Sequence, residues 1–425
     1  MLVHLRLERF KNFKDASLHL GPLSILIGSN ASGKSNIRDA FRFLHGLSRG
    51  YSIAEILGEK YVEGGFLQWA GVRGGVREAT YPGASTFSLT VTFTLGMRFR
   101  LIPTKYHIEV DPDVDGGNSR VVRESLYYGP QMRFDSHPPE NPVVQKDAQH
   151  IRVRIRPGGD YRRGHAETFI AHQPVLTQIA DRIGERRKDS KARVVVNHVK
   201  SVLSALQSMR FLDLDPDAMR KPSLPGQTIL GDRGENLSSV LQAIYKVRDQ
   251  RAALIEWIRE LTPMDARDFE FVPDQTGRIL VSLVEQNGHK TSAYSASDGT
   301  LRFLAMIAAL MGPKPAQFYF FEELDSGLHP ARLYLLLQLI EQKTFGGSIQ
   351  MVASTHSPQL MRFLSPKALK DTSLIYRLPD SYEGRIRGIM DMPDIEQILE
   401  QQDLARLHES GWFEDAMVFS EAGES

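Results

Sequence analysis

A stretch near the start of the chain has the residue types and spacing of a loop that binds phosphate. It runs from Gly28 to Ser35 (GSNASGKS) and fits the pattern G-x-x-x-x-G-K-[ST]. Gly28 and Gly33 let the backbone turn sharply, so that successive N–H groups can point at phosphate oxygens. Lys34 can reach the β- and γ-phosphates, and the Ser35 hydroxyl can ligate Mg²⁺. The other residues expected to contact the nucleotide are Ser29, Asn30, Ala31, Ser32 and Asn36. The stretch predicts a site for a nucleoside triphosphate with Mg²⁺.

A pair of acidic residues forms the second candidate group. Four large apolar residues, Phe318 to Phe321, predict a buried strand, and Glu322 and Glu323 follow directly. Ligands bind at this end of the strands in a parallel α/β sheet. Neighbouring side chains of a strand point to opposite sides, so the two carboxylates have different roles. We expect Glu322 to face the metal beside Ser35, and Glu323 to orient and deprotonate the attacking water. The alternative is a surface strand end that carries two acids.

A histidine follows a second apolar strand. The strand is predicted over Ser348 to Ala353, and His356 comes just after it. At that edge of the sheet His356 can contact the γ-phosphate or hold the attacking water.

Two weaker candidates complete the set. Ser297, Asp298 and Gly299 open a predicted helix that runs to about Met311, and a Ser-x-Gly turn at a helix start can bind an anion. Ser and Asp are also ordinary helix caps. Gln68 lies in a glycine-containing loop and could touch the metal or the water, although a surface glutamine is an equal interpretation.

These groups need particular elements to position them. The apolar run Leu23 to Ile27 predicts a buried strand before the loop, and Asn36 to Leu44 predicts the helix after it. That helix adds its positive end to the phosphate site. Alternation at Leu5 and Leu7 predicts an earlier strand, after which Asn12-Phe13 either borders the nucleotide or belongs to the core.

Composition limits the class of protein. The chain has 425 residues, 41% hydrophobic and 24% charged, which is typical of an ordinary globular protein of two or three domains or one split domain. Its formal net charge of +1 means that any nucleic-acid surface must be local. Zero cysteines exclude disulfides and suit a reducing cytoplasm. We expect neither a secretory signal nor a membrane span.

The segment between the phosphate loop and the acidic pair has patterns typical of strands first and of helices later. Alternating runs over Thr86 to Leu95, Arg98 to Val110 and Arg120 to Tyr128 predict an antiparallel meander. Apolar spacing then predicts helices over Val175 to Arg187, Val194 to Met209 and Asn236 to Leu261. Two strands joined by a hairpin turn at Asn287-Gly288 follow.

Two surfaces could bind a partner. Arg152, Arg154 and Arg156, with Arg162 and Arg163 beyond them, alternate with apolar residues and could contact a nucleic-acid backbone or form a solvated strand face. The tail holds an amphipathic helix and then the aromatics Trp412 and Phe413, which fit a packed terminal helix or a docking surface for a separate effector protein.

Taken together, the motifs resemble the ATPase heads of the ABC superfamily. Within that superfamily the chain resembles the RecF, OLD and SMC-related branch and bacterial ATP-binding proteins of the AAA_21 type. The segments EELDSGLHP (Glu322 to Pro330) and STHSP (Ser354 to Pro358) are especially similar to OLD-like ATPases. The resemblance is strong over residues 1–50 and 290–365. It implies an α/β P-loop NTPase fold with a mixed, mainly parallel sheet, an added antiparallel meander and an inserted helical region.

The resemblance also implies how the residues act. Two heads dimerise head-to-tail around two ATP molecules, and Ser297 and Gly299 cap the γ-phosphate bound by the other subunit. Residues 326–329 occupy the loop that crosses the interface, and His356 is the switch histidine. Glu322 stands where these ATPases usually carry Asp, and Ser297 to Thr300 departs from the transporter form LSGGQ. These departures argue against a transporter, and the insertion lacks the long coiled coil of SMC proteins.

The sequence therefore predicts an ATP-hydrolysing switch that forms a homodimer or a higher oligomer. We expect an ATPase lobe over 1–165, a helical insertion with a hairpin over 166–290, the completing part of the head over 291–390 and a helical tail over 391–425. No nuclease module follows the head, so a separate nuclease or toxin is the expected effector, in anti-phage defence or DNA maintenance. The alternatives are a RecF-like repair ATPase that binds DNA directly and a module that binds ATP without useful turnover.

Overall fold

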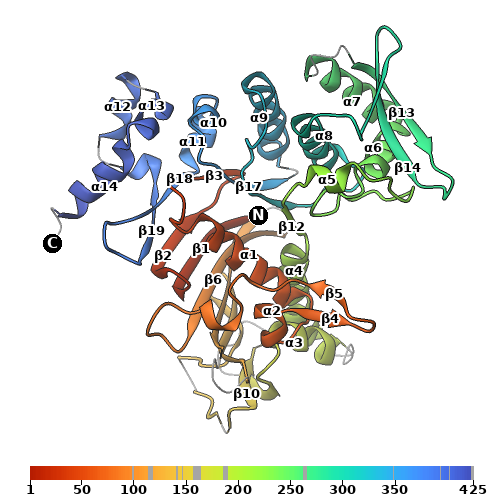
Figure 1. Cartoon of the computed structure of the whole chain (residues 1–425). Coiled ribbons are helices and arrows are strands. Elements are labelled where there is room, and N and C mark those ends of the chain that lie inside the picture. Colours follow the sequence, from red (N-terminus) through yellow and green to blue (C-terminus); the bar gives the residue numbers. More distant parts are fainter. Residues whose placement is uncertain are drawn as a thin grey trace.

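The chain folds around two sheets of different kinds, shown in the computed structural model (Figure 1). The structure describes residues 1–97, 100–112, 118–139, 142–145, 147–156, 164–184, 190–261, 266–347, 349–392, 394–401 and 403–422. Among these residues no helix is both long and apolar enough to cross a membrane.

The central sheet has six strands in the order β12-β16-β17-β3-β18-β19. The first five run parallel, and β19 is antiparallel to β18. The strands are β12 (Met209–Leu212), β16 (Phe318–Phe321), β17 (Gln350–Ser354), β3 (Leu23–Ile27), β18 (Thr372–Arg377) and β19 (Gly384–Gly388). Strands β3, β16 and β17 are buried over every residue, as apolar runs covered on both faces should be.

The second sheet is an antiparallel meander of eight strands in the order β11-β10-β9-β8-β7-β6-β1-β2. Its strands are β1 (Leu2–Phe10), β2 (Phe13–His19), β6 (Phe87–Met97), β7 (Arg100–Asp111), β8 (Arg120–Tyr128), β9 (Gln131–Asp135), β10 (His150–Ile155) and β11 (His165–Ile170). The predicted meander is confirmed. It begins with the first strand of the chain, which pairs with β2 on one side and β6 on the other.

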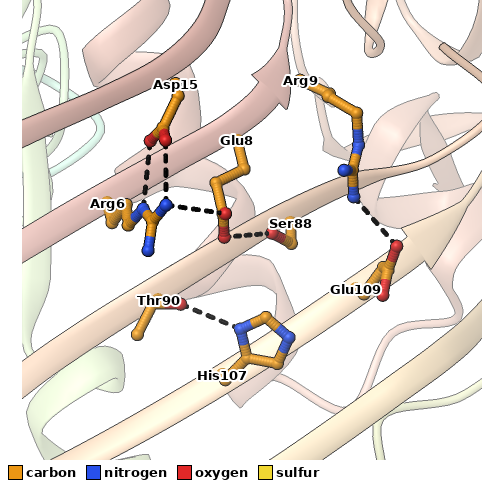
Figure 2. A network of polar contacts seen from close by, with 8 residues as sticks. All are labelled: Arg6, Glu8, Arg9, Asp15, Ser88, Thr90, His107 and Glu109. Carbon is orange, nitrogen blue, oxygen red and sulfur yellow. Dashed lines mark hydrogen bonds and ion pairs between the residues drawn. The ribbon is translucent and has the colours of Figure 1, made fainter.

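A polar network crosses one face of the meander (Figure 2). Arg6 on β1 donates two hydrogen bonds to Asp15 on β2, at 3.0 and 2.8 Å, and also pairs with Glu8 at 3.1 Å. Arg9 pairs with Glu109 on β7 at 3.0 Å. Because strand side chains alternate, this polar face leaves the opposite face of β1, with Leu5 and Leu7 fully buried, to the core.

Helix α1 (Lys34–Ser48) lies between the two sheets. Its Phe41 packs with Phe320 of the central sheet, and both belong to the apolar cluster that contains Phe87 of the meander. The other face of the central sheet, including Ile25 and Phe321, belongs to a second cluster with helices α8 (Asp298–Met311) and α9 (Pro330–Phe345). The strand that precedes the phosphate loop is therefore held from both sides.

The remaining elements surround this frame (Figure 1). They are α2 (Ile53–Leu57), β4 (Lys60–Val62), β5 (Phe66–Trp69), α3 (Val175–Gly184), α4 (Ser190–Gln207), α5 (Pro216–Met219), α6 (Leu237–Tyr245), α7 (Arg248–Leu261), β13 (Ala266–Pro273), β14 (Ile279–Glu285), β15 (Lys290–Ser292), α10 (Pro358–Arg362), α11 (Pro366–Lys370), α12 (Ile395–Gln401), α13 (Leu404–Glu409) and α14 (Trp412–Ala422), with short 3₁₀ turns at Val76–Glu78 and Ile389–Asp391.

Two sequence predictions need correction, and one alternative that the sequence left open is decided. The helix expected to reach Met209 ends at Gln207, and Met209 begins β12, which pairs with β16 in the central sheet. The helix expected from Asn236 to Leu261 is two helices, α6 and α7. Of the two alternatives for the tail aromatics, Phe413 fits the packed terminal helix: it is fully buried in the core, with Trp412 half-buried beside it.

Candidate functional site

Three neighbouring parallel strands end at one cavity of about 270 Å³. Strand β3 leads into the phosphate loop, β17 into residues 354–356, and β16 into Glu322 and Glu323. The cavity is lined by residues 30–36, the two glutamates, residues 354–356 and Arg73. The carboxyl ends of three adjacent strands thus bring together motifs that lie far apart in the sequence.

The glycines of the loop are required by its backbone. Gly28 has φ +146° and Gly33 has φ +124°, which other residues rarely adopt. A Cβ on Gly28 would lie 2.0 Å from the Ile375 carbonyl oxygen, and one on Gly33 would lie 2.8 Å from Asn12 Nδ2. The loop can take this shape only with glycine at both positions.

The turn between β1 and β2 holds the phosphate loop in place through hydrogen bonds. Asn12 is 5% exposed; its Nδ2 donates to the Ser32 carbonyl oxygen at 3.0 Å, and its Oδ1 accepts from Asn36 Nδ2 at 2.7 Å. Phe13 is fully buried next to it. Asn12 therefore holds the loop and the first turn of α1 together, and Phe13 belongs to the core.

Lys34 is held by carbonyl oxygens of its own loop. Its Nζ donates to Gly28 O at 2.5 Å and to Ser29 O at 2.8 Å. These contacts keep the ammonium over the loop, where a bound phosphate would offer it stronger, charged acceptors.

The two glutamates lie in different environments. Glu322 is partly buried and forms an ion pair with Arg38, whose Nη1 lies 2.7 Å from Glu322 Oε2. Arg38 stands one turn after Ser35 on α1. Glu323 is exposed and has φ +50°, while its backbone N–H donates to Ser354 Oγ at 3.3 Å. A positive φ in a residue other than glycine is uncommon and strained, so the chain turns sharply between the two carboxylates.

His356 is exposed at the edge of the cavity, and its neighbours are fixed. Thr355 is buried and its hydroxyl donates to Asp325 Oδ1 at 2.6 Å, which ties the end of β17 to the turn after β16. The carbonyl oxygen of His356 lies 3.4 Å from His408 Nε2, on α13 of the tail. The tail thus reaches the backbone of a candidate site residue.

The sequence reasoning missed Arg73 and Asp39. Arg73 lines the cavity, and its Nη2 lies 3.1 Å from Asp39, a carboxylate on α1 that is 1% exposed. Lys11 pairs with the same carboxylate at 2.9 Å. No motif marks these residues, because only the fold brings the β1–β2 turn and the segment after β5 against α1.

Gln68 does not line this cavity. It is exposed on β5 and borders a separate hollow with Arg42 and Arg210. Its expected contact with a metal beside Ser35 therefore has no support from the lining of the phosphate-loop cavity and stays a prediction.

The Ser-x-Gly tip also lies outside its own chain's cavity. Ser297 caps α8 by accepting from the Thr300 N–H at 3.2 Å, and Asp298 pairs with Arg220 at 2.6 Å. Ser297 and Asp298 are exposed, whereas Gly299 is buried against the loop 325–328: a Cβ there would lie 2.3 Å from the Gly327 carbonyl oxygen. The tip and this loop form one rigid surface.

The oxygen atoms around the cavity fit a magnesium ion that is shared with phosphate. In the described part of the chain, no group of three or more His, Asp or Glu side chains could hold a metal by itself. The Ser35 hydroxyl and the Glu322 carboxylate do line the same cavity. Mg²⁺ is held in such sites by one or two protein oxygens, phosphate oxygens and water, and this donor set meets that requirement.

Comparisons with known proteins found one matching family and several similar proteins. The family described as "AAA domain, putative AbiEii toxin, Type IV TA system" matches residues 23–362, from β3 to α10. A curated protein of Helicobacter pylori named ATP/GTP phosphatase is 20% identical over 379 residues, which is 86% of this chain and 87% of that protein. The solved SMC head domain from Thermotoga maritima is 13% identical with a TM-score of 0.41, covering 91% of this chain and 98% of that chain. The Smc head with an extended coiled coil, bound to the C-terminal domain of ScpA and derived from Pyrococcus furiosus, is 11% identical with a TM-score of 0.48, covering 94% and 99%.

Proposed function

The chain belongs to this AAA-domain family and is an ABC-type ATPase head, and from that premise we propose that it works as a switch driven by ATP binding and hydrolysis. The observation that carries the proposal is the single cavity that gathers residues 30–36, Glu322, Glu323 and His356. A phosphate loop, two acidic residues and a histidine around one cavity are what phosphoryl transfer to water needs.

We assign each group a role that its position supports. The loop N–H groups and the start of α1 bind the phosphates, and Lys34 exchanges its two carbonyl partners for phosphate oxygens. Glu323, exposed at the cavity, orients the attacking water and accepts its proton, and His356 contacts the γ-phosphate. Ser35 and Glu322 would hold Mg²⁺, which supplies positive charge to the phosphate oxygens when it is bound.

We propose further that two heads close on each other head-to-tail. The support is the position of Ser297 and Gly299: they stand at the N-terminal end of α8, with Ser297 exposed, and do not line the cavity of their own chain. A serine hydroxyl and a helix N-terminus are suited to a γ-phosphate, so a second copy can supply what the first lacks. Residues 326–329 lie against this tip and would cross the interface.

The process served is anti-phage defence or DNA maintenance in the cytoplasm, with a nuclease or toxin as the partner. The description of the family names a putative toxin and a type IV toxin–antitoxin system, which supports the first. The tail offers a surface for such a partner, because Phe419 on α14 is 79% exposed and Val418 beside it is also exposed. The absence of cysteine suits a reducing compartment.

Direct DNA binding is the second candidate. Its sequence support was the arginine strand, of which Arg162 and Arg163 lie outside the described residues. Arg152 and Arg154 on β10 are half-buried, and Arg156 is 6% exposed. Phosphate contacts need guanidinium groups that reach solvent, so these positions favour the effector switch over a DNA clamp.

The test is the Glu323→Gln protein. It keeps the shape of the side chain but cannot accept the proton, so we expect it to bind ATP, to hydrolyse almost none and to accumulate as a dimer with ATP. Phosphate release and size-exclusion chromatography with light scattering measure the two effects. The matched control is Glu256→Gln, an exposed glutamate on α7. Turnover of ATP by Glu323→Gln at the parental rate would overturn the role of Glu323.

A further inference from the structure

A second cavity lies further along α1. It has a volume of about 240 Å³ and is formed by α1, β5, β12 and the segment before α6, and it shares no lining residue with the phosphate-loop cavity. Its polar lining includes Arg42 and Arg49 from α1, Arg210 from β12 and Asp232. The role assigned to the first cavity does not use any of these residues.

The charge of this cavity is positive. Three guanidinium groups face one carboxylate, and the imidazole of His45 adds no charge near neutral pH because burial lowers the pKa of His45 to about 4. Arg49 Nε donates to His45 Nε2 at 3.1 Å, and His45 Nδ1 lies 2.8 Å from the Leu206 carbonyl oxygen. The histidine is thus a neutral part of the wall that fixes Arg49.

In the described part of the chain, three of the four charged side chains of this cavity form no ion pair. Arg42 Nε is buried and has no hydrogen-bond partner in the described part of the chain. Among the described residues, no ion pair within 4.0 Å involves Arg42, Arg210 or Asp232, although all three line the cavity. The Arg42 guanidinium carbon lies over the ring of Trp69, 5.0 Å from its centroid, which is a cation–π contact.

This arrangement leaves hydrogen-bond donors available to a ligand. The Arg42 Nε–H is buried without a partner, which costs free energy, and the planar guanidinium presents its N–H groups as a fork. That fork matches the oxygens of a planar or tetrahedral oxyanion. Burial is the main cause that lowers the pKa of Arg42, and the neighbouring Arg38 adds to it, whereas Asp232 and Asp39 oppose the shift.

We propose that this cavity binds a small oxyanion of the phosphate class, with Arg42 and Arg210 donating to its oxygens and Asp232 accepting from its hydroxyl group. The volume of about 240 Å³ has room for a phosphate group. Asp232 adds selectivity. Phosphate carries a proton near neutral pH that a carboxylate can accept in a hydrogen bond, whereas sulfate carries none and would leave two negative groups face to face.

Trp69 gives a local reporter. The chain has three tryptophans, Trp69, Trp257 and Trp412, so the double substitution Trp257→Phe and Trp412→Phe leaves only the one in the cavity wall. We expect inorganic phosphate to give a saturable change in its emission. The change should persist with Lys34→Ala, which removes the other phosphate-binding group, and sulfate should bind more weakly. A phosphate monoester is titrated in parallel, and the tighter of the two ligands shows whether the site takes a free anion or a phosphorylated molecule.

Substitutions identify the residues. Arg42→Gln and Arg210→Gln should each weaken binding about tenfold or more, because each removes a charge-assisted hydrogen bond. Asp232→Asn should reduce the preference for phosphate over sulfate. The control is Arg233→Gln, an exposed neighbour that does not line the cavity. If Arg42→Gln does not fold, the Tm of the parent protein provides the second measurement, since bound phosphate must raise it. The proposal is overturned if neither ligand changes the emission saturably, or if both arginine variants bind as the parent does.

Discussion

Arg38 forms an ion pair with Glu322, the carboxylate that the sequence assigns to the metal. Its guanidinium lies 2.7 Å from Glu322, and both side chains are largely buried, at 12% and 20% exposed. Water therefore screens the pair only in part, and the carboxylate must give up or share this partner when a metal ion approaches. Arg38 is one turn beyond Ser35, so the same helix supplies a proposed metal ligand and a competitor of the metal.

This competition predicts the effect of removing the charge. Arg38→Gln frees Glu322, so we expect Mg²⁺ to promote nucleotide binding at a concentration about tenfold lower than in the parent, which corresponds to roughly 1.4 kcal/mol. Isothermal titration of a non-hydrolysable ATP analogue at a series of Mg²⁺ concentrations measures this. Arg38→Lys keeps the charge and should behave like the parent. An unchanged Mg²⁺ dependence in Arg38→Gln would show that Glu322 does not meet the metal.

Among individual residues, the sequence predicts a functional role for those that belong to a motif and misses those that do not. Gly28 and Gly33 are identified by spacing, and their φ angles confirm that glycine is needed. Asn12 was left open between a nucleotide contact and the core, and it braces the loop instead. Nothing in the sequence marks Arg38 and Arg73 as site residues. An arginine in a helix or loop is common, and only the fold places these two beside Glu322 and Asp39.

One face of α1 connects the two cavities. Ser35, Arg38, Arg42 and His45 follow at intervals of three and four residues, which places them along one side of the helix. The far end of this stripe depends on a neutral histidine: His45 is 4% exposed and lies within hydrogen-bond distance of Leu206 O and Arg49 Nε. A protonated ring could not accept the bond from Arg49.

The stability of the protein should therefore depend on pH through His45. Its pKa is about 4 in the folded state and 6.5 in the unfolded state, so between these values the unfolded chain binds more protons. The contribution is complete above pH 6.5 and is lost as the pH falls toward 4; between pH 7 and pH 5 the loss is roughly 2 kcal/mol. Denaturant unfolding at several pH values measures it. His45→Gln should flatten this dependence, and His289→Gln, an exposed histidine in a hairpin, should leave it unchanged. Equal slopes in parent and His45→Gln would contradict the assignment.

Helices and strands were predicted correctly where one hydrophobic pattern extends over the whole element. Strands β3 and β16 and helix α1 agree with their apolar runs, and the meander follows from alternation. Strand β12 was missed because it has four residues directly after a helix and continues that helix's apolar spacing. Its pairing with β16 is a contact between residues more than 100 positions apart, which no local window contains.

At the scale of the whole molecule, the arrangement of the sheets separates two surfaces that the proposed mechanism needs together. The phosphate loop and the glutamates lie at the carboxyl ends of β3 and β16, whereas the tip of α8 is exposed away from that cavity. The tip cannot adapt freely, since Gly299 packs against Gly327 O and Asp298 is paired with Arg220. In the proposed head-to-tail dimer, a second copy would supply the tip.

A mixing experiment tests whether the tip acts on its own chain or on a partner. Ser297→Asp keeps a side chain that caps α8 but places a negative charge where the γ-phosphate of the other subunit would lie. Lys34→Ala removes the phosphate contact of the loop and leaves the tip intact. Each variant alone should hydrolyse almost no ATP. In an equal mixture half of the dimers contain one chain of each kind, and one of their two sites then joins an intact loop to an intact tip.

We therefore expect the mixture to recover about a quarter of the parental phosphate-release rate per chain, because half of the dimers regain one of two sites. A mixture of Lys34→Ala with Glu323→Gln is the control. Each site of this mixed dimer has an intact tip but lacks either Lys34 or Glu323, so we expect no recovery of phosphate release. If Ser297 acted within its own chain, the first mixture would be as inactive as its components. Recovery in the first mixture and its absence in the second would locate Ser297 opposite the γ-phosphate of a partner, which no contact within a single chain can achieve.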